Sequence, residues 1–116
     1  TQLMNWYIAL LSFKVSTSSV MTQFDEHLRL IQADDLEDAV FKARLLGITE
    51  EDQFFNEKKS LVSWEFVNVS DVRLLEELAH GAELYSCIYE TSEGRRYIRD
   101  VHQRAQALQA KMTIIG

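Results

Sequence analysis

The stretch FDEHLRLIQADDLEDA, residues 24–39, contains the strand-to-helix junction on which the predicted fold depends. Phe24, Leu28 and Leu30 alternate with polar residues, as in a strand that buries one face. The opposite face, which we expect to be wet, carries Asp25, His27 and Arg29.

A helix is predicted directly after this strand. Asp34 and Asp35 stand at the N-cap position, and Glu37 and Asp38 follow at a spacing close to that of a capping box. Apolar residues then recur at helical spacing as far as Gly47, which we expect to end the helix.

Further strands are predicted on both sides of this helix. Residues 4–15 carry apolar side chains at both parities, which indicates a strand covered on both faces and therefore central in its sheet. FFN and LVSWEFVNV, joined by EKKS, predict a hairpin that ends near Val72. RLLEELAH, residues 73–80, is predicted as a short helix or turn, and ELYSCIYE, residues 83–90, as a further strand.

A C-terminal helix over residues 92–113, capped by Thr91 or Ser92, completes the predicted order ββαββ(α)βα. This order is typical of an α+β domain. We therefore expect a single domain over residues 1–116, with a mostly antiparallel sheet of four to five strands and two main helices.

Composition narrows the class of protein. The chain has 116 residues, 47% hydrophobic and 26% charged, as in an ordinary globular domain. Its net charge of -6 disfavours nucleic acid and anionic membranes as partners. The longest apolar run, NWYIALLSF, is shorter than the roughly 20 residues that span a bilayer. The single Cys87 cannot form an intramolecular disulfide, so we expect a cytoplasmic protein.

Several segments carry a family resemblance: WYIALL, FDEHLRLIQADDLEDAVFKARLLG, FFN, VSWEFVNVSDVRLL and GAELYSCIYE. In this order they resemble the bacterial domain of unknown function family 4288, over about residues 6–90. The resemblance implies a small cytoplasmic α+β domain of bacterial type, and it transfers no catalytic residue. The C-terminal helix lies outside it.

Glu26 falls in phase with the apolar face of the predicted strand. It is either a buried carboxylate that serves as a general base, or a solvated residue at the end of the strand. We favour the solvated interpretation, because burying an unpaired carboxylate is costly.

Aromatic residues on several predicted strands offer an alternative function as a small enzyme or small-molecule binder. Its pocket would lie near Glu26, Trp64 and Tyr85. The candidate ligand-binding residues are Trp6, Glu26, Trp64 and Tyr85. We expect Cys87 to be buried and inert. No cluster of residues has metal-ligand spacing, so we predict no metal ion. We also predict no catalytic residue and no cofactor.

The C-terminal helix combines an apolar seam with basic charge, and between Glu93 and Lys111 it carries five basic and two acidic residues. The seam can pack on its own sheet or on a partner subunit. We predict a non-catalytic binding or protein-interaction module that acts as a homodimer or as an accessory to another bacterial protein. The candidate interface residues are Arg95, Arg96, Arg99, Ile98, Val101, Leu108 and Met112.

Overall fold

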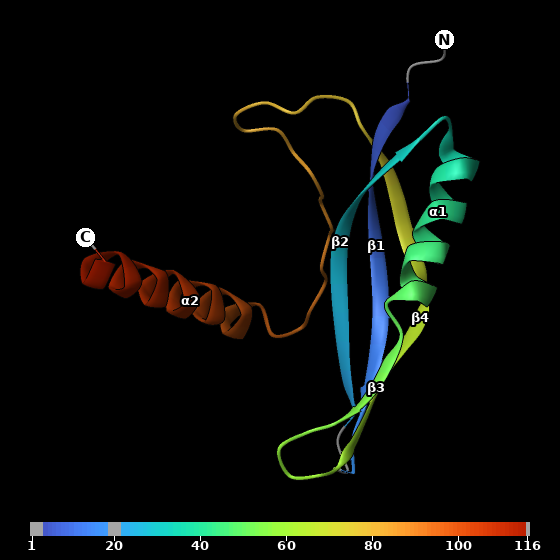
Figure 1. Cartoon of the computed structure of the whole chain (residues 1–116). Helices are drawn as coiled ribbons and strands as arrows, with labels where there is room; N and C mark the ends of the chain where they lie inside the picture. Colours follow the sequence, from blue (N-terminus) through green and yellow to red (C-terminus); the bar gives the residue numbers. More distant parts are fainter. Residues whose placement is uncertain (1–3, 19–21, 116) are drawn as a thin grey trace. The chain divides into compact units, whose positions relative to one another are not determined.

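The computed structural model describes residues 4–18 and 22–115, and the chain divides into two compact units, Thr1–Tyr85 and Ser86–Gly116. In the first unit one helix lies on one face of a four-stranded sheet (Figure 1). The second unit contains one long helix. The elements are β1 (Asn5–Ser16), β2 (Gln23–Ala33), α1 (Leu36–Thr49), β3 (Asp52–Phe55), β4 (Leu61–Leu75) and α2 (Gly94–Ile115).

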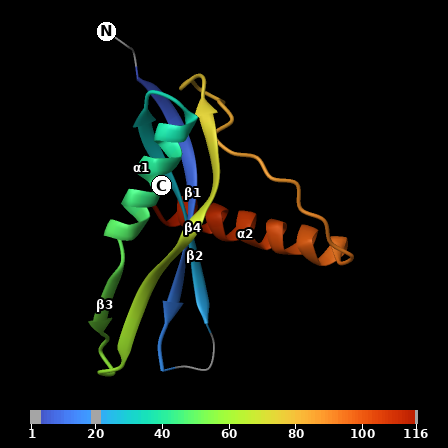
Figure 2. The same ribbon diagram turned by 90° about the vertical axis from the view of Figure 1, so that its right-hand side faces the viewer.

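The predicted α+β class is confirmed, with an antiparallel sheet in the order β2-β1-β4-β3 (Figure 2). β1 lies between β2 and β4, as its apolar residues at both parities predicted. The two predicted hairpins are present as the antiparallel pairs β1–β2 and β3–β4. The tip of the first hairpin, residues 19–21, lies outside the described residues.

Of the two segments predicted near the end of the sheet, the strand is wrong, and the segment predicted as a short helix or turn contains a turn. β4 continues to Leu75, and the described residues 76–93 contain neither a helix nor a strand. The strand predicted at 83–90 is therefore absent. Residues 73–80, predicted as a short helix or turn, form the end of β4 and lead into a turn at 80–81. An alternating pattern becomes a strand only where it pairs with a neighbouring strand, and residues 83–90 pair with none of the four strands.

The buried face of β2 is also the reverse of the prediction. The register pairs Tyr7 with Ile31 and Leu11 with His27, which places the odd-numbered residues of both strands on the side of α1. Phe24, Leu28 and Leu30 lie on the other face and are exposed. Alternation thus identified a strand with two unlike faces, but α1 determines which face is covered.

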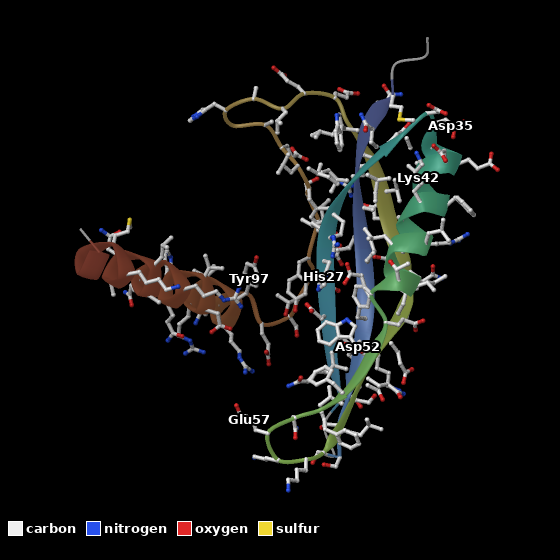
Figure 3. All side chains as sticks on the ribbon, in the orientation of Figure 1. His27, Asp35, Lys42, Asp52, Glu57 and Tyr97 are labelled. Carbon is white, nitrogen blue, oxygen red and sulfur yellow. The ribbon has the colours of Figure 1, made fainter. Side chains whose placement is uncertain are left out.

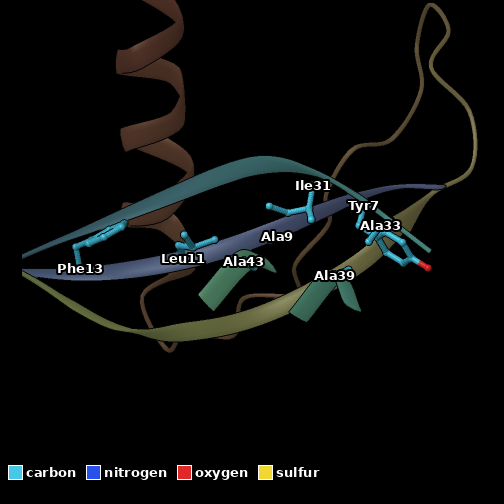
Figure 4. Packing of buried hydrophobic residues seen from close by; sticks show 8 residues of the cluster. All are labelled: Tyr7, Ala9, Leu11, Phe13, Ile31, Ala33, Ala39 and Ala43. Atoms are coloured by element: carbon cyan, nitrogen blue, oxygen red, sulfur yellow. The ribbon is translucent and has the colours of Figure 1, made fainter. Parts of the chain in front are cut away.

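Small residues form the contact between α1 and the sheet. Ala9 and Ala33 on the strands and Ala39 and Ala43 on the helix are fully buried in the hydrophobic core (Figure 4). Gly47 extends this series, because the helix continues through it to Thr49 instead of ending there as predicted. The core is completed by larger side chains from the central strand, Tyr7, Leu11 and Phe13, and by Ile31.

The start of α1 follows the prediction. Asp35 is the N-cap, and its side chain accepts a hydrogen bond from the N–H of Asp38 at 2.8 Å. The carboxylate of Asp38 accepts in turn from the N–H of Asp34 at 3.2 Å. This backbone hydrogen bond, assisted by Lys42, lowers the pKa of Asp38. The ionised carboxylate therefore stabilises the helix start at neutral pH, and the contribution is lost as the pH falls through the lowered pKa.

Two β-bulges keep apolar residues of β4 on the α1 side. The register against β1 shifts between Leu10 and Leu11 and again between Ser12 and Phe13. Each shift adds one residue to β4, so Phe66, Val69 and Val72, spaced three apart, all pack against the core. A regular strand would have turned Val69 to the opposite face.

We expect Gly47→Ala to destabilise the first unit, because a Cβ at this position would overlap the ring of Phe66. Overpacking of this kind costs about 1–3 kcal/mol, partly offset by the higher helix propensity of alanine. Chemical denaturation should therefore show a lower free energy of unfolding by about 1 kcal/mol or more. Gly94→Ala is the control, since a Cβ there meets nothing within 4 Å. Equal effects of the two variants would contradict this packing.

Cys87 is exposed, so the prediction that it is buried is wrong. It lies within residues 76–93, which form no strand, and its side chain is exposed. We expect a thiol reagent at neutral pH to label the native protein at a rate close to that of the unfolded chain. Labelling only after denaturation would contradict the exposed position.

Candidate functional site

On the α1 side of the sheet, polar residues of β2 form a chain of contacts beside an aromatic cluster. The ring of His27 lies 4.9 Å from that of Phe13 and 6.4 Å from that of Trp64, centroid to centroid (Figure 3). Its Nε2 lies 2.8 Å from Asp25 Oδ2, and its Nδ1 lies 3.4 Å from Arg29 Nη1. Arg29 also donates to Glu50 Oε1 at 2.9 Å.

These contacts are compatible with one neutral tautomer of His27. A guanidinium only donates hydrogen bonds, so Nδ1 faces Arg29 as an acceptor, and Nε2 carries the proton toward Asp25. Both ring nitrogens are thereby engaged by protein groups. The cluster is suited to structural support and leaves His27 with no free nitrogen for a substrate.

The residues that follow α1 contact β2 and β4, the two strands that flank β1. Glu50 pairs with Arg29 on β2, while Glu51 accepts a hydrogen bond from the N–H of Phe66 on β4 at 3.0 Å. Two adjacent carboxylates thus hold the C-terminal end of α1 across the sheet. No group of three or more His, Cys, Asp or Glu within the described ranges is placed to hold a metal ion.

The opposite side of the sheet presents an apolar face that α1 does not cover, which we call the open apolar face. Trp6, Phe24, Leu28 and Leu30 are exposed on it, whereas Leu10 is partly exposed and Ile8 is buried at 7% exposure. The register pairs Ile8 with Leu30 and Leu10 with Leu28, so these side chains lie together. Trp6, Phe24, Leu28 and Leu30 are 46, 66, 50 and 57% exposed. Exposed apolar side chains grouped in this way make the face a candidate interaction surface.

A shallow hollow lies at one end of the open apolar face. Its volume is about 300 Å³, and it is lined by Trp6, Leu30, Leu75, Glu76 and Leu78. The segment after β4 borders the same side, because the Tyr85 ring lies 5.1 Å from the guanidinium of Arg73, the β4 partner of Ile8. The hollow is thus mostly apolar, with one carboxylate beside it.

The structure separates the sequence-predicted ligand residues. Trp6, Glu26 and Tyr85 belong to the open side, whereas Trp64 is paired with Val15 and lies with the core on the α1 side. Glu26 and Trp64 therefore share no pocket. Glu26 is paired with Ser12, six residues along β1 from Trp6, which corresponds to about 20 Å.

Glu26 is exposed, in agreement with the solvated interpretation, although it lies within β2 rather than at its first residue. It stands between Phe24 and Leu28 on the open apolar face. Trp6 and Glu26 are residues of this face that the sequence predicted, whereas its aliphatic residues were not predicted. Their alternation was visible, and we interpreted it as burial.

In the second unit, α2 carries the predicted interface residues. Ile98, Val101, Leu108 and Met112 are exposed and share one stripe of the helix by their spacing. Near the start of the helix, the rings of Tyr89 and Tyr97 stack with centroids 5.5 Å apart, and Arg96 lies 3.5 Å from Glu93. The helix start is therefore held by local contacts.

The first unit is therefore a small α+β domain in which α1 covers one face of the sheet and not the other. A family model described as Domain of unknown function (DUF4288) matches residues 6–86. The chain belongs to this family. No curated protein and no solved structure matches it. Within the described residues, no helix is both long and apolar enough to cross a membrane.

We expect Arg29→Gln and Glu50→Gln each to lower the free energy of unfolding by about 0.2–1 kcal/mol, because the pair is half-exposed. The double variant should lose less than the sum of the two, since each single change already breaks the same ion pair. Denaturant unfolding of the four proteins measures this coupling. Strict additivity would show that the 2.9 Å contact contributes nothing.

Proposed function

We propose that this chain is a non-catalytic protein-interaction module that binds a second copy of itself through the open apolar face. The observation that carries the proposal is the exposure of Phe24, Leu28 and Leu30 on β2 and of Trp6 on β1, all on the same side of the sheet. Leaving such a surface in water is unfavourable, at roughly 25 cal/mol for each Å² of apolar area. A partner that covers it recovers this free energy.

The position of β2 supports the same proposal. In the described part of the chain β2 pairs with β1 alone, so it is an edge strand that also exposes apolar side chains on one face. Edges of this kind invite further association unless they are covered or charged. A specific partner would satisfy the apolar face and shield the edge.

A small-molecule binder at the hollow near Trp6 is the second candidate. The hollow of about 300 Å³ is at the lower limit for ligand pockets and is open to solvent. Its size and apolar lining suit one anchoring side chain of a protein partner. The exposed Cys87 stays reduced most readily in a reducing compartment, which supports a cytoplasmic setting.

We expect sedimentation velocity at micromolar concentration to show a dimer, and Leu28→Lys to weaken it by more than about tenfold in Kd, because a buried charge costs well over 1.4 kcal/mol. Leu45→Lys on α1 is the matched control. Leu28 is 50% and Leu45 47% exposed, so both changes should leave the fold intact.

Two results would contradict this proposal. A monomer over the whole concentration range would remove the homodimer. Equal weakening by Leu28→Lys and Leu45→Lys would place the interface away from the open apolar face.

A further inference from the structure

The stripe on α2 has the length of the open apolar face. Ile98 and Met112 are fourteen residues apart, which corresponds to about 21 Å along a helix. Phe24 and Leu30 are six residues apart on β2, which corresponds to about 20 Å along a strand. A helix that lies along β2 would therefore bring the apolar stripe of α2 against the β2 residues from Phe24 to Leu30.

The two units carry opposite charge. Thr1–Tyr85 contains fifteen acidic and seven basic residues, whereas Ser86–Gly116 contains three acidic and five basic residues. Helical spacing places Arg104 and Lys111 beside the apolar stripe of α2. Glu26 stands within the row of Phe24 and Leu28 on the open apolar face. Approach of a basic helix to this face is thus favoured by long-range electrostatics as well as by apolar contact.

From these observations we infer that the open apolar face binds helix α2 of a second copy of this chain, in a reciprocal dimer. The inference rests on the proposed function and names the segment that occupies the face. Each copy contributes one face and one helix, so a two-fold arrangement covers both stripes and both faces at once. A large apolar side chain from the stripe enters the hollow beside Trp6, in the manner of an interface anchor.

Cysteine cross-linking between two distinguishable copies tests this inference. In a Cys87→Ser background, Leu28→Cys is placed in a copy with a solubility tag and Leu108→Cys in an untagged copy. The two are expressed together and oxidised. Neither chain holds both cysteines, so a disulfide between Leu28→Cys and Leu108→Cys can form only between copies. We expect this mixed-size product to be the main cross-linked species.

Arg44→Cys in place of Leu28→Cys is the matched control, because Arg44 is an exposed residue of α1 and lies outside the open apolar face. It should give several-fold less mixed-size product. A chain that carries both Leu28→Cys and Leu108→Cys provides the opposing case. If it closes only within itself, and the mixed pair gives no product, the inference is overturned.

The measurements distinguish an error in the role of α2 from an error in the proposed homodimer. A dimer that Leu28→Lys weakens, without any mixed-size product, would keep the open apolar face as the interface and remove α2 as its occupant. A monomeric wild-type chain would overturn the proposed homodimer itself. Leu108→Glu should raise Kd at least tenfold if α2 is the occupant, and an unchanged Kd would also remove it.

Discussion

One helix can cover only one face of a sheet, and this constraint governs the first unit. α1 lies close to the strands because Ala39 and Ala43 meet Ala9 and Ala33, with Gly47 beside Phe66 at the far end. Close packing of these small residues gives many dispersion contacts between the helix and the sheet. The consequence is a well-formed core on one side and an uncovered apolar face on the other.

The ends of α1 are held by charged groups that also secure the sheet. Asp35 and Asp38 hold the start of the helix beside β2, while Glu50 and Glu51 reach β2 and β4. These contacts lie at the boundary of the core, where water weakens each ion pair. Their main effect is to position α1 over the sheet, and this position determines which residues the helix covers.

The chemistry available on the two faces differs accordingly. Beyond the end of α1, His27 is enclosed by Asp25, Arg29 and aromatic rings, and its hydrogen bonds are directed to the protein. The open apolar face carries mainly apolar side chains, with Glu26 between Phe24 and Leu28 and Glu76 at the hollow near Trp6. Recognition through apolar contact is therefore the activity that the geometry supports best.

The sequence by itself determined the class of fold, because local signals are strong where they involve neighbouring residues. The N-cap at Asp35, the apolar residues of β1 at both parities and the two hairpins were all predictable from spacing along the chain. Only the tertiary structure decided which face of β2 is buried, that Gly47 continues the helix, and that Glu26 and Trp64 lie on opposite sides. Alternation indicates that a strand has two unlike faces, but it does not indicate which face a distant helix will cover. Likewise, the bulges that keep Val69 in the core depend on pairing with β1, which is remote in sequence.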